Sequence, residues 1–406
     1  MNRKLRKAAL WIVAGELAVV MGGSTLLTPL YLLYRHHFGF SEITLTLIYS
    51  VYVLGNLLAL FIFGRLSDQI GRRLTTWPVL VIAAISTLIF LFATRTGSLF
   101  AARLINGVAT GLAAGTATAW IAELHRDKIK AAAIASAANL IGIALGPLLS
   151  GLLAAFAPWP LRLSYIVYMA ILILVAVAIS QAPETVEHPV RNWEGLSLRP
   201  RVGVPREIRG PFVSPAVTAF GVFALGGFYC ALVPGLLARS LNLKSPAASG
   251  TIVFGLFIVA ALTAAIMRKM KSQTSMLLGL AVLLPSVALL LAGEALRSLP
   301  LVILATLLGG ISVALGYCGS LQVINEVAPE NQRSEVISSY LIAVYFGNSI
   351  PVVGLGLLSG IVSPLVAHTI FAGLVAVFAV IGLFTGWKYP PKHQSRTGKR
   401  EQLQAA

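Results

Sequence analysis

The sequence predicts an all-α membrane protein with 12 transmembrane helices in two pseudo-symmetric six-helix bundles. Composition, a series of long apolar segments and a polar linker near the middle of the chain indicate this fold. Of the 406 residues, 57% are hydrophobic and only 11% are charged, whereas a soluble protein carries about 25% charged residues. The chain cannot cover a globule with polar surface, so lipid must be its solvent. At about 30 residues for each helix and its loop, the length fits about 12 helices.

Each apolar segment is close to the roughly 20 residues that a spanning helix needs. Lipid cannot satisfy exposed backbone groups, and the segments are too long for barrel strands, so we expect helices. The first segment follows a basic start, but it is too long for the core of a signal peptide, and we expect an uncleaved helix. The segments lie at 8–33, 41–63, 75–94, 98–122, 132–156, 162–182, 212–238, 247–267, 274–293, 299–324, 335–361 and 364–387.

A polar stretch at 183–211 separates the sixth and seventh segments. It holds five prolines, five arginines and four glutamates, a composition typical of a linker. We therefore predict an N-terminal bundle over 1–182, a cytoplasmic linker over 183–211, a C-terminal bundle over 212–390 and a cytoplasmic tail over 391–406.

The two halves show weak internal similarity. A shift of 204 or 205 residues lays Pro29 on Pro234 and Pro147 on Pro351, and brings Glu123 near Glu326. Internal repeats of this kind are typical of transporters that bind their substrate near the midplane between two halves.

The net charge of +17 reflects topology. Of the 31 lysines and arginines, 24 fall on the side of the N-terminus and one, Arg103, falls inside a helix. This bias places the N- and C-termini in the cytoplasm and the chain in the cell membrane. We expect no nucleic-acid partner, because no basic patch with interleaved aromatics appears. Six basic residues fall on the outer side: Arg35, Arg95, Arg162, Arg239, Lys244 and Arg297.

The loop between the second and third segments carries Gly64-Arg-Leu-Ser-Asp-Gln-Ile-Gly-Arg-Arg73. Its glycines allow a tight loop, and Asp68 lies among Arg65, Arg72 and Arg73. The decapeptide resembles the motif Gly-x-x-x-Asp-x-x-Gly-Arg-Arg/Lys between helices 2 and 3 of the major facilitator superfamily. The resemblance implies that family's fold and a secondary transporter, not an enzyme.

The resemblance also implies a latch on the cytoplasmic side. Asp68 would face the positive N-terminal end of helix 11 near Ser334, and Arg72 would meet Glu123 at the end of helix 4. These contacts would hold the halves closed on that side. The alternative is that the charges only determine topology. The latch residues are Gly64, Asp68, Gly71, Arg72, Arg73 and Glu123.

Glu16 is the only carboxylate in the interior of a predicted helix. It lies roughly 12–13 Å from the basic edge of the first segment, a depth at which acids usually face a cavity. Burial disfavours the charged form, so Glu16 could exchange a proton near neutral pH. It resembles the helix 1 acid of the superfamily's drug/proton antiporters. The alternatives are snorkelling to the surface and a polar packing contact.

Arg103 is the only base in the interior of a predicted helix, and glycines at 107, 111 and 115 follow it. Such a ridge favours close helix packing. Arginine and ridge together resemble the helix 4 motif of proton-coupled members, which implies a role in proton coupling. Roughly 15 Å of depth separates Arg103 from Glu16, so we expect no direct salt bridge. A field effect through water, or a contact in one state only, stays open.

The fifth segment resembles the antiporter motif Gly-x-x-x-Gly-Pro-x-x-Gly-Gly, with Ser150 in place of one glycine. Proline removes a backbone donor and favours a bend. The small residues would let this helix press against helix 8, and a plain kinked packing helix is the alternative. The motif residues are Gly142, Gly146, Pro147, Ser150 and Gly151.

The family's fold implies a substrate cavity lined by helices 1, 4, 7 and 10. We expect His36, His37 and His368 to be surface residues near the outer face. The C-terminal half has no acid or base in a helix interior, which suits a lipophilic, neutral or weakly cationic substrate. The cavity candidates are Tyr31, Asn106, Phe223, Phe228, Tyr229, Tyr317 and Gln322.

These features predict a proton-coupled efflux transporter that works by alternating access. No nucleotide-binding loop appears, so ATP is not expected as the energy source. We expect no metal and no cofactor besides the proton as coupling ion. The expected partners of a monomer are the lipid bilayer, a small-molecule substrate and protons. The alternatives are an importer or facilitator of a sugar or small metabolite, and a non-transporting receptor or scaffold.

Overall fold

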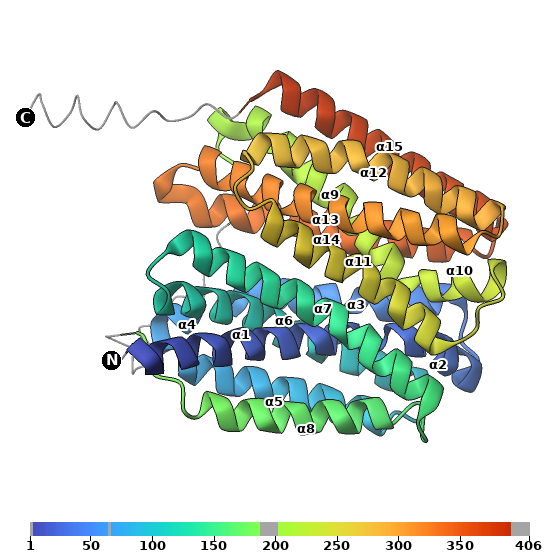
Figure 1. Cartoon of the computed structure of the whole chain (residues 1–406), viewed down its shortest axis with the longest axis horizontal. Coiled ribbons are helices and arrows are strands. Elements are labelled where there is room, and N and C mark those ends of the chain that lie inside the picture. Colours follow the sequence, from blue (N-terminus) through green and yellow to red (C-terminus); the bar gives the residue numbers. More distant parts are fainter. Residues whose placement is uncertain (1–2, 64–65, 187–201, 391–406) are drawn as a thin grey trace, which may run out of the picture.

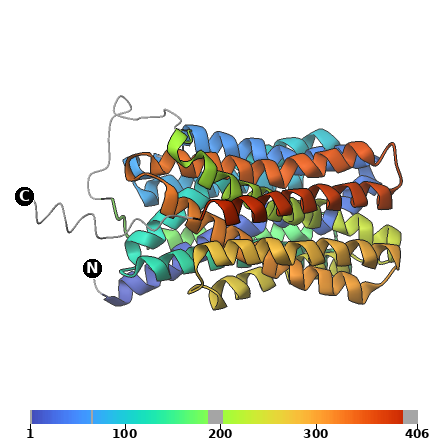
Figure 2. The same ribbon diagram turned by 90° about the horizontal axis from the view of Figure 1, so that it is seen from above.

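The computed structural model of the chain describes residues 3–63, 66–186 and 202–390, and every regular element in these ranges is helical. The helices run side by side along one axis in two layers, with the N-terminal half below the C-terminal half in Figure 1. The turned view in Figure 2 shows the same common direction. Eleven of the described helices are long and apolar enough to cross a membrane, and the shorter apolar helix Leu163–Ile179 is the twelfth. The predicted membrane fold is therefore confirmed.

The N-terminal bundle holds six spans, and its first span is broken. The break lies at a short 3-10 turn, Thr28–Leu30, which contains Pro29. In chain order the elements are α1 (Arg3–Thr25), η1 (Thr28–Leu30), α2 (Tyr31–Phe38), α3 (Glu42–Phe63), α4 (Leu66–Ile70), α5 (Arg72–Leu91), α6 (Thr96–Leu124), α7 (Lys128–Phe156) and α8 (Leu163–Ile179).

The C-terminal bundle repeats this pattern. Its first span is broken at the position of Pro234, and Pro351 lies inside a helix as Pro147 does in α7. Both matches were expected from the internal similarity of the sequence. The elements are η3 (Arg206–Ile208), α9 (Arg209–Ala231), α10 (Val233–Ser240), α11 (Pro246–Ile266), α12 (Ser272–Ala295), α13 (Leu299–Val327), η4 (Glu330–Gln332), α14 (Arg333–Leu358) and α15 (Pro364–Lys388).

The long helices end at two opposite faces of the molecule. We call the end where α1 begins and α15 ends the terminal face, and the opposite end, where α2 and α10 end, the distal face (Figure 1). In the predicted orientation the terminal face is cytoplasmic.

The bundles are joined in the distal half of the molecule. Asn348 of α14 accepts a hydrogen bond from the Tyr49 hydroxyl of α3 at 3.0 Å, and its amide donates to the Tyr52 hydroxyl at 2.5 Å. At the distal face, Arg239 of α10 pairs with Glu42 of α3. Among the described residues, the hydrogen bonds and ion pairs that join the two bundles all lie in this half. The structure is therefore closed on the distal side.

Small residues make the closest approaches between the bundles. An ideal Cβ on Gly250 of α11 would lie 2.3 Å from the carbonyl oxygen of Pro147 in α7, and one on Gly151 would lie 2.6 Å from that of Pro246. On the other side of the interface, an ideal Cβ on Gly356 would meet Thr46. Side chains are absent where the backbones touch, so van der Waals packing seals this half.

Candidate functional site

The motif between α3 and α5 forms a charged cluster at the terminal face. Arg72 is 6% exposed. Its Nη2 lies 2.7 Å from Oε1 of Glu123 at the end of α6, and its Nη1 lies 2.5 Å from Oδ1 of Asp68. The structure thus brings Arg72 and Glu123 together in the way the resemblance implied. Gly64 lies outside the described residues.

Asp68 does not reach the other bundle in this structure. Its side chain is 56% exposed, and within the described ranges no hydrogen bond or ion pair joins it to Ser334 or the rest of α14. Arg72, one helical turn further on, is its partner. The contact expected between Asp68 and helix 11 is absent from this distally closed state.

Two further residues complete the cluster, and the sequence analysis missed their role. The Glu184 carboxylate accepts the backbone N–H groups of Arg72 and Arg73 at 2.9 and 3.0 Å, and Thr185 donates to Glu123 at 2.5 Å. Gly71 has φ +111°, and a Cβ there would lie 2.6 Å from Oε2 of Glu184. Glycine is therefore required for the Glu184 carboxylate to cap α5. The available signal was an acid just after the sixth segment, beside a basic loop.

Arg103 lies inside the N-terminal bundle and is 2% exposed. Its guanidinium donates to the carbonyl oxygens of Ser24 at 2.5 Å and of Tyr49 at 3.0 Å. It also lies over the Tyr52 ring, 4.5 Å from the centroid. Arg103 thus ties the end of α1 to α3, next to the tyrosines that bind Asn348 of the other bundle. No ion pair joins Arg103 to Glu16 in the described part of the chain, as expected.

Glu16 is buried in α1, at 1% exposure. Its Oε2 has no hydrogen-bond partner among the described residues. The Tyr168 hydroxyl of α8 donates to the carbonyl of Val19 in α1 at 3.1 Å. A buried carboxylate oxygen without a donor is costly when it is charged, so the neutral, protonated acid suits this site.

The helix 5 motif serves two interfaces. Ideal Cβ atoms on Gly142 and Gly146 would lie 2.1 and 2.2 Å from the carbonyl oxygens of Ala18 and Gly22 in α1. Pro147 and Gly151 face α11, as expected for contact between helices 5 and 8. Ser150 donates to the Gly146 carbonyl at 3.0 Å within its own helix, so the serine in place of glycine is accommodated without a new partner.

The cavity candidates divide into two groups. The Tyr31 hydroxyl and the Oδ1 of Asn106 are buried without hydrogen-bond partners. Phe223 and Tyr317 meet edge to face, with ring centroids 5.2 Å apart, and both are half-buried. Buried polar atoms without partners need an explanation, and a bound substrate or water would supply one.

The second group does not lie with the first. Phe228 stacks on Phe371 and contacts His368 inside the C-terminal bundle, and the Tyr229 hydroxyl lies 3.0 Å from that of Thr306. Gln322 is exposed.

The prediction for His368 was wrong. His36 and His37 are exposed at the distal face, but His368 is 4% exposed and its Nδ1 lies 2.6 Å from Oε2 of Glu294, itself 5% exposed. The short helix α10 contacts α12 at this end of the bundle, and Ser240 donates to Glu294 at 3.2 Å. The sequence pattern around His368 shows only its own helix end and not the contacts supplied by other helices.

A family model described as Major Facilitator Superfamily matches residues 17–351. The chain belongs to the Major Facilitator Superfamily. It is a multi-pass membrane transporter rather than an enzyme. Its fold is similar to that of a bacterial homologue of the human lysosomal transporter Spinster, with TM-score 0.74 and 15% identity over 95% of this chain and 97% of that one. The nucleoside transporter NupG aligns with TM-score 0.73 and 14% identity, over 94% and 99% of the two chains.

Sequence relatives of this superfamily member include drug resistance proteins. The chain is 27% identical to the chloramphenicol resistance protein CraA of Acinetobacter baumannii over 161 residues, 39% of each protein. It is 30% identical to the multidrug resistance protein MdtM of Salmonella typhimurium over 175 residues, 41% of this chain and 39% of that protein. The matches thus span about two fifths of these relatives.

Proposed function

We propose that this superfamily member exports lipophilic, neutral or weakly cationic small molecules in exchange for protons. The observation that carries the proposal is Glu16, a fully buried acid with a carboxylate oxygen that no described group satisfies. Acids at this depth of a membrane protein are costly and usually functional. The names of the relatives CraA and MdtM support export of drug-like molecules.

The proposed cycle uses the two ends of the molecule in turn. With the terminal face in the cytoplasm, the distally closed structure is the inward-facing state. Glu16 takes up a proton in the outward-facing state and carries it into the inward-facing state, and this structure, with Glu16 buried, corresponds to that state before the proton leaves. Substrate that enters from the cytoplasm favours release of the proton and the return to the outward-facing state. The bundles rock about the central region between them, and the membrane potential supplies about 2.3 kcal/mol per charge per 100 mV.

The charged cluster at the terminal face is the proposed inner latch. In this state Asp68 is exposed and held by Arg72. When the bundles close on the cytoplasmic side, Asp68 swings to the positive N-terminal end of α14. The Arg72–Glu123 ion pair keeps α5 and α6 together in both states, so that the loop moves as one piece.

The substrate contacts are proposed to lie where the structure leaves polar atoms without partners. Tyr31 and Asn106 supply a hydroxyl and an amide oxygen, and the Phe223–Tyr317 pair supplies an aromatic surface. None of these groups carries a formal charge at neutral pH. They therefore suit an apolar molecule with a few hydrogen-bonding groups better than a phosphate or a dicarboxylate.

Transport in proteoliposomes with an imposed pH gradient tests the role of Glu16. Wild-type protein should move a lipophilic dye against its gradient and dissipate the proton gradient in step, and Glu16→Gln should abolish both fluxes. Glu330→Gln is the matched control, because Glu330 is an exposed acid on the terminal face. Unchanged proton-driven transport in Glu16→Gln would remove Glu16 from the mechanism.

The alternative function is an importer or facilitator of a sugar or small metabolite. It is favoured by the match to the probable metabolite transport protein CsbC of Bacillus subtilis, 27% identical over 141 residues. This alternative predicts uptake without proton counterflow and tolerance of Glu16→Gln. The same vesicles, loaded with sugars or nucleosides instead of a dye, distinguish the two.

A further inference from the structure

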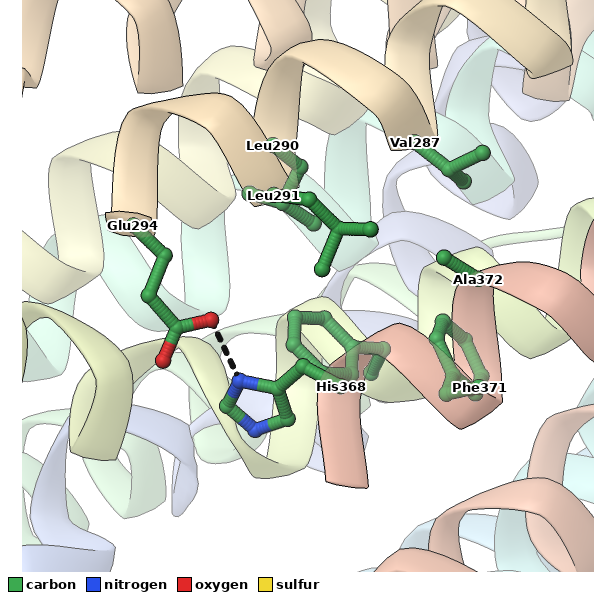
Figure 3. Close-up of a pocket in the computed structure, with 8 residues that line it drawn as sticks. Val287, Leu290, Leu291, Glu294, His368, Phe371 and Ala372 are labelled. Atoms are coloured by element: carbon green, nitrogen blue, oxygen red, sulfur yellow. Dashed lines mark hydrogen bonds and ion pairs between the residues drawn. The ribbon is translucent and has the colours of Figure 1, made fainter. Parts of the chain in front are cut away.

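A buried acid–base pair lies near the distal face of the C-terminal bundle, outside the proposed transport machinery. Glu294 is the next-to-last residue of α12 and His368 lies in the second turn of α15, and their side chains point at one another (Figure 3). Nδ1 of His368 lies 2.6 Å from Oε2 of Glu294. Around the pair, α9, α12 and α15 contribute apolar side chains: Phe228, Val287, Leu290, Leu291, Phe371 and Ala372.

The pair is linked to the closure between the bundles through α10. Ser240, the last residue of α10, donates to the second oxygen of Glu294 at 3.2 Å. Arg239, the residue before it, binds the carboxylate of Glu42 in the other bundle through its two terminal guanidinium nitrogens. Nη2 of Arg239 lies 3.1 Å from Oε1 of Glu42. Arg35 of α2 supports the same carboxylate at 3.3 Å. One turn of α10 therefore contacts both the buried pair and the distal ion pair.

The other described charged groups at this end of the C-terminal bundle do not neutralise the charge of the pair. Arg239 is directed to Glu42, and Lys244 and Arg297 are exposed. The facing residue from α10 is the neutral Ser240, and those from α9, α12 and α15 are apolar. Only one proton held between Glu294 and His368 keeps this buried site neutral.

We propose that Glu294 and His368 form a proton-binding switch that controls the distal ion pair between Arg239 and Glu42. With a proton bound, the neutral pair holds α10 through Ser240 and the distal face stays closed. Loss of the proton leaves a buried carboxylate without a counter-charge, which is strongly unfavourable. Hydration of that carboxylate requires α10 to move away, and this movement pulls Arg239 from Glu42. An acidic exterior therefore closes the distal face, and a basic one opens it.

Distance measurements between spin labels across the distal face test the switch. One label replaces Ser41 before α3 and the other replaces Lys244 after α10, in a background with Cys230 and Cys318 changed to alanine. Wild-type protein in nanodiscs should shift from short to long distances as the pH is raised. The ratio of open to closed molecules should change about tenfold or more.

Substitutions at the pair should remove this pH dependence. His368→Gln and Glu294→Gln should each give a ratio that does not vary with pH, whereas His37→Gln, at an exposed histidine of the same face, should keep the wild-type profile. Ser240→Ala preserves the buried pair and should still reduce the shift, which guards against variants that fold poorly. A wild-type profile in His368→Gln, or an equal loss in His37→Gln, would overturn the proposal. The experiment measures a distance and not transport. The switch can therefore be confirmed or refuted even if the proposed proton-coupled efflux is wrong.

Discussion

The close backbone contact between α7 and α11, which we call the seam, makes the distal closure sensitive to a single methyl group. An ideal Cβ on Gly250 would lie 2.3 Å from the Pro147 carbonyl oxygen, and ordinary contact begins at 3.4 Å. Gly250→Ala therefore requires the two backbones to separate by about 1.1 Å at this point. Overpacking of this kind costs roughly 1–3 kcal/mol, and the cost falls only on the distally closed state. We expect the closed population to fall roughly 5- to 150-fold relative to the open one.

The labels at positions 41 and 244 measure this change directly. Gly255→Ala is the matched control, because a Cβ at that position of α11 would lie 3.6 Å from the Thr306 methyl group, an ordinary contact. The control should give the wild-type distance distribution. The reasoning is refuted if Gly250→Ala leaves the distribution unchanged, since the seam would then be dispensable to the closed state.

Two further predictions concern buried arginines. Arg72→Lys keeps the charge but loses the paired hydrogen bonds to Glu123, so we expect a loss of about 2 kcal/mol in stability. Thermal unfolding of the purified protein checks this, with Arg73→Lys as a milder comparison, because within the described ranges the Arg73 guanidinium donates one hydrogen bond, to the Ser180 carbonyl. Arg103→Lys cannot span the carbonyls of Ser24 and Tyr49 together, so transport should fall more than tenfold. Normal transport in that variant would show that charge alone suffices.

The sequence predicted those features that lipid imposes on each helix separately. Long apolar runs and the polar breaks between them predicted all 12 spans to within a few residues at each end. Pro29 and Pro234 were matched as repeat positions, and the structure breaks the first span of each bundle there. The pairing of Arg72 with Glu123 followed from the family motif, and the close contact of helices 5 and 8 followed from small residues around Pro147.

The features that sequence reasoning missed depend on contacts between distant segments. His368 and Glu294 both lie near helix ends, where local pattern indicates exposure. They are buried because they pair with one another among apolar side chains of α9, α12 and α15, and Ser240 of α10 contacts Glu294. Phe228 was assigned to the cavity, but the rotation of α9 directs it toward α15. Helix rotation about its own axis is set by packing against several neighbours, and an apolar helix in lipid carries little amphipathic signal for it.

The repeat also places a counterpart of the charged cluster in the C-terminal half. Glu326 ends α13 as Glu123 ends α6, and each meets the first residue of a neighbouring helix. In the N-terminal bundle that residue is Arg72. In the C-terminal bundle it is Ser272, whose hydroxyl donates to Glu326 at 2.8 Å. The same junction is therefore an ion pair in one half and a single hydroxyl–carboxylate hydrogen bond in the other.

This difference suits different roles of the two halves at the terminal face. The Arg72 guanidinium makes several hydrogen bonds to the Glu123 carboxylate and carries the opposite charge, whereas Ser272 gives Glu326 one hydrogen bond, so α5 and α6 are joined more firmly than α12 and α13. A loop carried on the firmer junction moves together with α5 and α6 when the bundles rock, and it carries Asp68 with it. The C-terminal bundle needs no such rigidity at the terminal face, because its part of the proposed latch is the N-terminal end of α14, whose backbone N–H groups are available in any state.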